Sequence, residues 1–462
     1  MPAERDGAPV SLDPAVPRRV HVVGAGGAGM SAIASVLAAM GHTVTGSDLK
    51  PSPTLERLAA TGVSVGVGHD PARVAGVDVV AISSAIPASN PEVVAARRAG
   101  VAVLTRAEVL AQVAAGRRCV AVSGTHGKTT TTSMLALVLV EAGLRPSFLI
   151  GGDLNEIGTN AVWDSGEWLV LEADESDGTF LHLAPEVAVV TNVEPDHLDH
   201  YGDFDHLVAA FEEFLARAPA GVAGGDDPVA ARLGRAHGAV LVGTGPDVDY
   251  RVEDVRAGAE GVTFDLVHGE VLGRLALPVT GARIATNAAV AAVAAMAVGA
   301  PFDAARRALA RFAGVARRFE ARGEWRGARF VDDYAHLPTE VAAVIEAARA
   351  TAPARLVVVF QPHRYSRVAA LGPAFADAFV GADAVVVTDV FAAGETPLPG
   401  VSGRLVADAV RAAHPGAAVD YVAGRAELRA HVAALLEPGD LCLTLGAGDL
   451  TTLPDEIQAV VA

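Results

Sequence analysis

The chain has 462 residues, of which 51% are apolar and 19% are charged, so it is long enough for about three domains and too apolar for a disordered protein. Its 36 basic and 54 acidic residues give a net charge of −18, which disfavours general binding to nucleic acid or to anionic membranes. The two cysteines, Cys119 and Cys442, exclude a disulfide framework and a cysteine-based zinc cluster.

The first predicted element is a short buried strand at residues 19–23, and no secretory signal is visible before it, so we expect a cytoplasmic enzyme. The loop 24–29 follows, and its glycines Gly24, Gly26 and Gly29 fit the pattern G-x-G-x-x-G. A helix over 30–40 and strands over 41–48 and 77–82 come next. Asp48 stands 19 residues after Gly29, where an acid that binds a ribose is expected. The pattern predicts a bound pyrophosphate without selecting the nucleotide, and by itself it suggests a nicotinamide-dependent dehydrogenase.

A second strand, loop and helix occupy residues 118–122, 123–130 and 131–141. Gly127-Lys128-Thr129 is the G-K-[ST] core of a P-loop, in which backbone amides hold phosphates, the lysine bridges the β- and γ-phosphates and the hydroxyl binds Mg²⁺. The full pattern has glycine at position 122, which is Val122 here, so the loop is a variant whose Gly124 comes two residues late. Lys128 and Lys50 are the only lysines in the chain, so a lysine-dependent step at this loop requires Lys128.

Polar residues follow the next two predicted strands, at 167–171 and 187–190. They are Glu172, Asp174, Glu175, Asp177, Asp196, His197 and Asp199. Ligands of α/β sheets bind beyond the carboxyl ends of the strands, so we expect these residues and the Lys128 loop to form one site. Mg²⁺ prefers oxygen ligands and takes few protein carboxylates, so one or two of them are expected to be ligands. Two nucleotide-type loops indicate that one holds ATP and the other a nucleotide-tagged substrate, which disfavours simple hydride transfer.

The last part of the chain has predicted strands at 355–360, 384–387 and 441–445. Arg364 and Arg367 follow the first of them, and paired guanidinium groups suit recognition of a carboxylate or phosphate. The uncharged stretch 284–302 is expected to be a buried helix rather than a membrane span. Strands alternate with helices along the whole chain, which predicts an α/β fold with parallel sheets.

These motifs together resemble the Mur ligases over nearly the whole chain, and most of all the members that add L-alanine. The segments that carry the resemblance are HVVGAGGAGMSAIA (21–34), GSD (46–48), SSAI (83–86), GTHGKTTTTS (124–133), EADESDGTFLHL (172–183), TNVEPDHLDHY (191–201), GVARRFE (314–320), DDYAHLPTE (332–340), FQPHRYSR (360–367) and GAGD (446–449).

The resemblance implies a Rossmann-like UDP-sugar-binding domain at 1–116, a central P-loop ATPase-type domain at 117–321 and a C-terminal Rossmann-like, amino-acid-binding domain at 322–462. It implies a reaction in peptidoglycan precursor synthesis, in which ATP and Mg²⁺ serve to join L-alanine to the lactyl carboxylate of UDP-N-acetylmuramate through an acyl phosphate. A monomer or weak homodimer is expected.

The resemblance also implies site residues. For ATP they are Gly124, Thr125, His126, Gly127, Lys128, Thr129, Thr130 and Asn287, and for the metal Thr129, Glu172 and His197. For the sugar nucleotide they are Gly24, Gly26, Gly27, Gly29, Asp48, Ser83 and Ser84. For the amino acid they are Tyr334, His336, Arg364 and Arg367, and the catalytic set is Lys128, His336, Arg364 and Arg367.

The chain departs from the family pattern at three places. Leu337 follows His336 where a second histidine is usual, Arg283-Ile284 replaces a His-Asn pair before Asn287, and no lysine after Lys128 is present to be carbamylated. Three alternatives stay open: a murein tripeptide ligase acting on the same sugar nucleotide, a nicotinamide-dependent dehydrogenase and a non-catalytic UDP-sugar-binding protein.

Overall fold

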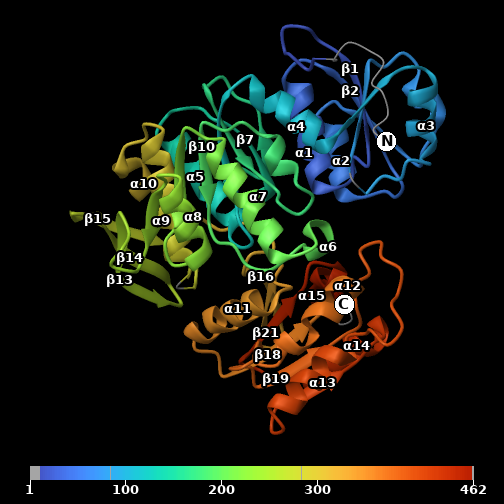
Figure 1. Cartoon of the computed structure of the whole chain (residues 1–462). Helices are drawn as coiled ribbons and strands as arrows, with labels where there is room; N and C mark the ends of the chain where they lie inside the picture. Colours follow the sequence, from blue (N-terminus) through green and yellow to red (C-terminus); the bar gives the residue numbers. More distant parts are fainter. Residues whose placement is uncertain (1–10, 84, 282, 460–462) are drawn as a thin grey trace. The chain divides into compact units, whose positions relative to one another are not determined.

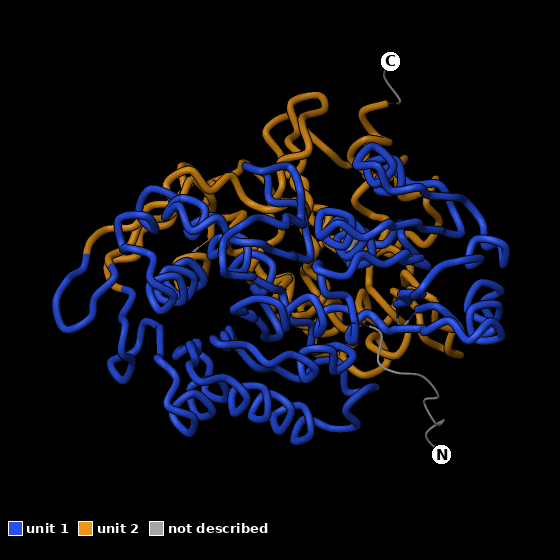
Figure 2. Tube along the Cα trace, turned by 90° about the horizontal axis from the view of Figure 1, so that it is seen from above, with its two compact units in different colours: residues 1–252, 266–272, 287–309 blue, residues 253–265, 273–286, 310–462 orange. Residues whose placement is uncertain are grey.

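The structure is a computed structural model that describes residues 11–83, 85–281 and 283–459. The chain forms two compact units, one of residues 1–252, 266–272 and 287–309 and the other of residues 253–265, 273–286 and 310–462 (Figure 2). Three sheets with interleaved helices follow one another along the chain (Figure 1), which confirms the predicted α/β class. Among the described helices, none has both the length and the hydropathy of a membrane span.

The first sheet has five parallel strands in the order β3-β2-β1-β4-β5. Its strands are β1 (Arg19–Val23), β2 (Thr43–Asp48), β3 (Ser64–Val67), β4 (Val79–Ile82) and β5 (Ala102–Thr105). Its helices are α1 (Ala28–Ala39), α2 (Pro53–Ala60), α3 (Pro91–Arg98) and α4 (Arg106–Ala115), with the 3₁₀ turn η1 (Pro71–Val74). The strand order reverses between β1 and β4, and such a switch point is where sheets of this type bind ligands.

Local sequence signals explain where these helices begin. Ser52 and Asn90 cap α2 and α3 with side-chain oxygens, and each helix has a proline in its first turn. Thr105 and Glu108 form a reciprocal capping box at the start of α4. Helix α1 differs because its N-cap is Gly27, which provides no side-chain hydrogen bond.

The second sheet has the order β12-β11-β10-β6-β9-β7-β8, and β13, β14 and β15 extend it beyond β12 to ten strands. Its strands are β6 (Arg118–Ser123), β7 (Ser147–Leu154), β8 (Thr159–Val162), β9 (Trp168–Glu172), β10 (Val187–Val190), β11 (Ala220–Gly224), β12 (Val240–Gly243), β13 (Tyr250–Gly258), β14 (Gly261–His268) and β15 (Glu270–Leu277). The accompanying helices are α5 (Lys128–Glu141), η2 (Thr179–His182), α6 (Leu198–Tyr201), α7 (Phe204–Ala216), α8 (Pro228–Ala236), α9 (Arg283–Ala297) and α10 (Phe302–Leu309). Both β6 and β10 are fully buried along most of their length, as the apolar runs in the sequence predict.

Two helix predictions in this part of the chain need correction. Helix α5 begins at Lys128, three residues before the predicted start, because Gly127 adopts φ +77 and serves as the N-cap. The predicted single helix over 284–302 is two helices, α9 and α10. Gly299 has φ +96 and Pro301 follows it, so the helix cannot continue through this turn although the stretch carries no charge.

The third sheet has the order β16-β17-β21-β18-β19-β20, and all its pairs are parallel except β16 with β17. Its strands are β16 (Glu320–Trp325), β17 (Ala328–Asp333), β18 (Arg355–Phe360), β19 (Ala384–Val387), β20 (Val419–Tyr421) and β21 (Asp440–Leu445). The helices are α11 (Pro338–Ala350), α12 (Tyr365–Leu371), η3 (Gly372–Phe375), α13 (Arg404–Ala413), α14 (Arg425–Leu435), η4 (Asp449–Thr452) and α15 (Leu453–Gln458).

Candidate functional site

Strand β6 runs directly into the second glycine loop and then into α5. Gly124 has φ +135, and a Cβ at this position would lie 2.1 Å from Thr191 Oγ1, so the loop requires glycine here. A Cβ at Gly127 would lie 2.8 Å from Asn287 Nδ2, which places the Asn287 side chain against the loop. The predicted ATP-binding residues 124–129 and Asn287 are therefore neighbours, and Thr130 is buried in the first turn of α5.

Asn192, which follows β10, holds the loop from the other side. Its Oδ1 accepts a hydrogen bond from the backbone N–H of His126 at 2.8 Å, and its backbone oxygen accepts one from the N–H of Thr125 at 3.0 Å. The His126 imidazole lies 3.1 Å from a carboxylate oxygen of Glu194. The loop is thus fixed by residues of the neighbouring strand end.

Lys128 has an acidic partner, Glu175, one of the acids expected at this site but not predicted to pair with the lysine. Lys128 Nζ lies 2.7 Å from Glu175 Oε1 and 2.6 Å from the backbone oxygen of Gly124. The Glu175 side chain is only 2% exposed, and its Oε2 has no hydrogen-bond partner among the described residues. Burial raises the pKa of Glu175 to about 7, and the Lys128 ammonium opposes this rise only in part.

A second acid, Asp174, also acts on Lys128. Burial alone would lower the pKa of the lysine, but Glu175 and Asp174 raise it above its ordinary value, so the ammonium remains charged. Burial alone would raise the pKa of Asp174, but Arg106 and Lys128 hold it well below its usual range. The site therefore presents a permanent cation beside a loop whose geometry requires glycine.

Thr129 and Glu172 form the second polar contact at this edge of the sheet. Thr129 Oγ1 donates to Glu172 Oε1 at 3.0 Å, and Glu172 Oε2 accepts from the N–H of Gly151 at 2.6 Å. His197, with φ +53, places Nε2 4.0 Å from Glu175 Oε1. Among the described residues, no three His, Cys, Asp or Glu side chains are grouped closely enough to hold a metal ion.

The first glycine loop lies at the switch point of the first sheet. Gly24 has φ +82, and its N–H donates to the backbone oxygen of Ser47 at 2.8 Å. Asp48 Oδ2 accepts from the N–H of Gly26 at 2.9 Å, so the acid expected at a ribose holds the loop itself in this structure. Ser83 Oγ lies 3.9 Å from the position of a Cβ on Gly24, and Ser84 lies outside the described residues.

Beneath this loop is a buried carboxylate that sequence analysis missed. Glu92, in the first turn of α3, is fully buried and accepts a hydrogen bond from Ser47 Oγ at 2.6 Å. His69 Nδ1 lies 3.0 Å from Glu92 Oε2, and His21 Nε2 lies 3.6 Å from Oε1. Glu92 thus fixes the side chain of Ser47, whose backbone oxygen receives the N–H of Gly24.

The predicted amino-acid residues come together in the second unit. Tyr334 and His336 follow β17, and their ring centroids lie 5.5 Å apart. His336 Nδ1 lies 3.3 Å from Glu340 Oε2. Arg364 follows β18 as the N-cap of α12 and has φ +66, an unusual value for a residue with a side chain.

His363 is a member of this group that the sequence did not single out. Its ring centroid lies 5.6 Å from that of His336, and Arg367 Nη1 lies 3.0 Å from its Nδ1. The ring is also stacked on Phe391, at 5.7 Å between centroids. His363 stood within the segment FQPHRYSR, which was the available signal. Arg317 and Arg318, from the segment GVARRFE, place their guanidinium groups over Tyr334 at 5.0 and 5.2 Å.

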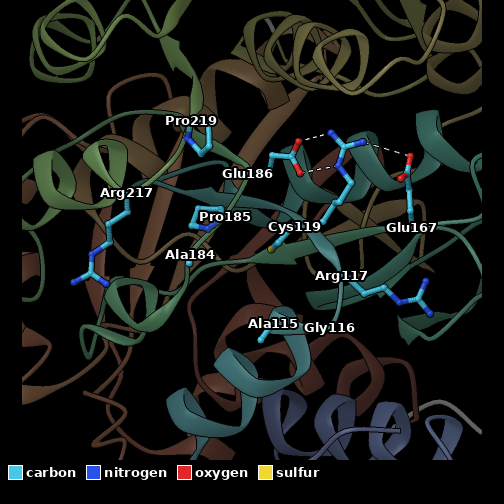
Figure 3. A pocket seen from close by; sticks show the side chains of 11 residues that line it. Ala115, Gly116, Arg117, Cys119, Glu167, Ala184, Pro185, Glu186, Arg217 and Pro219 are labelled. Carbon is cyan, nitrogen blue, oxygen red and sulfur yellow. Dashed lines mark hydrogen bonds and ion pairs between the residues drawn. The ribbon is translucent and has the colours of Figure 1, made fainter. Parts of the chain in front are cut away.

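A pocket of about 710 Å³ lies elsewhere, at the amino ends of β6, β9, β10 and β11 (Figure 3). Arg118 lines it and is paired with Glu186 and Glu167. Because ligands of α/β sheets bind at the carboxyl ends of the strands, we do not assign the reaction to this pocket.

Three family descriptions match the chain along its length. "Mur ligase family, catalytic domain" matches residues 19–118, "Mur ligase middle domain" residues 122–295, and "Mur ligase, glutamate ligase domain" residues 317–448.

Curated relatives match over nearly the whole chain. The UDP-N-acetylmuramate--L-alanine ligase of Kineococcus radiotolerans is 49% identical over 456 residues, which are 96% of both chains. The ligase of the same name from Gloeobacter violaceus is 47% identical and covers 97% of both chains.

Solved structures show the same fold. UDP-N-acetylmuramate-alanine ligase from Thermotoga maritima superposes with a TM-score of 0.82 at 27% identity, covering 96% of this chain and 99% of the other. A murein peptide ligase from Psychrobacter arcticus gives a TM-score of 0.73 at 23% identity over 96% and 98% of the two chains.

Proposed function

The chain belongs to the Mur ligase family, and we propose that it joins L-alanine to the lactyl carboxylate of UDP-N-acetylmuramate with hydrolysis of ATP to ADP and phosphate. The observation that carries the proposal is the charged Lys128 ammonium beside Gly124, at the carboxyl end of β6. A lysine at the start of a P-loop helix is suited to bind the β- and γ-phosphates. Two relatives that match nearly the whole chain are named UDP-N-acetylmuramate--L-alanine ligase.

ATP would be held by the loop 124–130. Lys128 and Thr129 would contact the phosphates, and Asn287, which lies against Gly127, would contact the nucleoside side of ATP. The donor atoms of the site are of the kind that Mg²⁺ prefers, because the Thr129 hydroxyl and a carboxylate oxygen of Glu172 lie 3.0 Å apart. Nearby, the buried Oε2 of Glu175 has no hydrogen-bond partner among the described residues. We propose Thr129, Glu172 and His197 as the metal-binding set. When bound, Mg²⁺ supplies positive charge that offsets the repulsion between triphosphate and carboxylate.

The sugar nucleotide would bind at the switch point of the first sheet. Gly24, Gly26, Gly27 and Gly29 allow close approach of a diphosphate to the backbone, and Asp48 and Ser83 lie beside them. The amino acid would bind in the second unit, with Arg364 and Arg367 on its carboxylate and Tyr334 and His336 near its amine.

The reaction proceeds in two steps. The lactyl carboxylate attacks the γ-phosphate, forming an acyl phosphate and releasing ADP, and Lys128 stabilises the charge that develops on the phosphate oxygens. The neutral amine of L-alanine then attacks the acyl carbon, and phosphate leaves from the tetrahedral intermediate. His336, oriented by Glu340, would accept the amine proton.

We keep three further expectations as proposals. The chain would divide into parts at 1–116, 117–321 and 322–462, which is consistent with three separate sheets. It would act in the cytoplasm as a monomer or weak homodimer, which cell fractionation and analytical ultracentrifugation would test. The product would serve peptidoglycan synthesis, and with it cell shape and division.

Phosphate release from ATP in the presence of UDP-N-acetylmuramate tests the reaction. We expect release to require both the sugar nucleotide and L-alanine, and serine and glycine as acceptors measure selectivity. A higher rate with the tripeptide than with L-alanine would favour the murein peptide ligase alternative. UDP binding without ATP turnover would contradict any ligase activity, and reduction of a nicotinamide cofactor would favour a dehydrogenase.

A further inference from the structure

Arg106 connects the two nucleotide-type sites of the first unit. It is the first residue of α4, and the Thr105–Glu108 capping box fixes its backbone. Its Nη1 lies 3.1 Å from Asp174 Oδ2 in the acidic segment that follows β9. Asp174 also attracts Lys128, so one carboxylate lies between the cation of the P-loop and the cation of α4.

The other side of the Arg106 guanidinium faces the first glycine loop. Arg106 Nε lies 3.4 Å from the position of a Cβ on Gly29, so the side chain packs directly on the backbone at this glycine. The Nε atom is buried and has no hydrogen-bond partner among the described residues. A buried donor without an acceptor is costly, and a ligand oxygen at this place would remove the cost.

The start of α1 adds a second attraction for a negatively charged group at the same place. The N-cap, Gly27, makes no side-chain hydrogen bond, and the first turn of α1 contains no acidic residue. The uncapped N–H groups and the helix dipole therefore favour an anion here. Arg106 lies beside this helix start through its contact with Gly29.

We propose that Arg106 binds the diphosphate of the sugar nucleotide through its Nε side, while Asp174 holds Nη1. The proposal rests on the proposed function, since it assigns a binding residue within the sugar-nucleotide site. Guanidinium nitrogens form a planar fork that matches a phosphate, so a substrate diphosphate would lie between Arg106 and the glycine loop. The Asp174 contact orients the fork and leaves the Nε side for the ligand.

Calorimetric titration of the full-length enzyme with UDP, and separately with UDP-N-acetylmuramate, tests the assignment without ATP. We expect Arg106→Ala to weaken binding of both ligands by about tenfold to a hundredfold, because a charge-assisted hydrogen bond is lost. Arg106→Lys should lie between Arg106→Ala and the wild type, because lysine keeps the charge without the fork. In the complete reaction, KM for the sugar nucleotide should rise and KM for L-alanine should stay within about twofold.

Arg57→Ala is the matched control. Arg57, on α2, also pairs with an acid of the second sheet, since it lies 3.5 Å from Asp153 on β7. Its side chain is 62% exposed. Its loss should leave UDP binding unchanged. If it weakens UDP binding as much as Arg106→Ala does, loss of an ion pair explains the effect and the proposal is wrong.

The remaining outcomes are equally decisive. The proposal would be overturned if Arg106→Ala bound UDP as tightly as the wild type and had an unchanged melting temperature. It would also be overturned if the variant lost affinity for UDP-N-acetylmuramate but not for UDP, since that result would place Arg106 on the lactyl carboxylate. If Arg106→Ala does not fold, Arg106→Lys decides by the same titrations. If the wild type released no phosphate, the proposed reaction would be wrong. The UDP titration would still show whether Arg106 binds the diphosphate, because it does not depend on turnover.

Discussion

Lys128 Nζ lies 2.7 Å from Glu175 Oε1, and the same ammonium also contacts the backbone oxygen of Gly124 at 2.6 Å. Under the proposed function, the phosphate oxygens of ATP would compete with these two oxygens for the Lys128 ammonium. Binding of a triphosphate therefore requires an exchange of partners, in which Glu175 gives up the ammonium. The raised pKa of Glu175, about 7, eases this exchange because the acid can become neutral when its cation turns to the phosphates.

Lys128→Ala should lower the rate of phosphate release by about a thousandfold or more, because the charge on the transferred phosphate loses its stabilising cation. The fold should persist. A buried Glu175 without its partner costs about 1–3 kcal/mol, a part of the total stability of a domain. Rates are measured with saturating substrates, and stability by urea unfolding.

The double variant Lys128→Ala/Glu175→Gln is the control for that experiment. Removing the unpaired acid should restore most of the lost stability without restoring turnover. Phosphate release that survives in Lys128→Ala would contradict the P-loop role of this lysine.

Gly124→Ala tests the loop geometry. The new Cβ would lie 2.1 Å from Thr191 Oγ1 and 3.0 Å from the backbone oxygen of Asn192, at φ +135. Strain and overlap together should cost about 3 kcal/mol or more in the free energy of unfolding. Gly124→Ala should also bind a non-hydrolysable ATP analogue more weakly than the wild type.

Gly143→Ala provides the matched comparison. Gly143 also has a positive φ, +75, but a Cβ there meets nothing within 4 Å, so the cost should be only about 1 kcal/mol. Equal losses in the two variants would mean that backbone strain alone matters and that the Thr191 contact does not.

The two glycine loops were predictable because their chemistry is local. Each loop is a short run of neighbouring residues, so its glycines and its lysine could be recognised in the sequence. Gly24 and Gly127 indeed have positive φ values. The partner of Lys128 was not predictable, since the acids after β9 include several candidates. The adjacency of β6 and β9 brings all these acids to the loop, and only the folded positions of the side chains show that Glu175 contacts Lys128 while Glu172 contacts Thr129.

Other residues escaped prediction for related reasons. Glu92 is 45 residues from Ser47, and nothing near it in the sequence indicates that α3 buries its acid under β2. His363 lies within a recognised segment, but its role appears only when its ring is seen beside His336. The break between α9 and α10 was missed because absence of charge was given more weight than Gly299 and Pro301.

Arg364 offers a test in which binding and stability change in opposite directions. Its φ of +66 is unfavourable for arginine and favourable for glycine, so Arg364→Gly should hold or raise stability by up to about 1 kcal/mol. The same variant should raise KM for L-alanine about tenfold or more, because the guanidinium that would bind the carboxylate is gone. Arg364→Ala should raise KM equally without the gain in stability.

Arg411→Ala is the control for this pair. Arg411 is a half-buried arginine of the same unit, paired with Asp408 at 3.1 Å on α13 and hydrogen-bonded to the backbone oxygen of Val419. Its loss should leave KM for L-alanine unchanged. An unchanged KM in both Arg364 variants would remove Arg364 from the amino-acid site.

Glu92 predicts a pH dependence of stability. Burial alone would raise the pKa of its carboxyl, but the facing His21 imidazole and hydrogen bonds from Ser47 Oγ and the Asp70 N–H lower it from 4.5 to about 2. A lowered pKa means that the unfolded chain takes up the proton more readily. The contribution of Glu92 is therefore complete above pH 4.5 and is lost as the pH falls toward about 2. The lost free energy is about 3 kcal/mol.

Glu92→Gln, compared with the wild type by urea unfolding across this pH range, measures that contribution. At pH 7 the variant should be less stable. The carboxylate accepts from Ser47 at one oxygen and from Asp70 at the other, whereas an amide has only one oxygen that can accept. The difference between the two proteins should shrink steadily as the pH falls from 4.5 to about 2, since the wild-type carboxyl then becomes neutral. Glu56→Gln, an exposed acid on α2, should differ from the wild type by less than about 0.5 kcal/mol throughout. A difference for Glu92→Gln that stays constant with pH would show that the carboxylate charge contributes nothing to the fold.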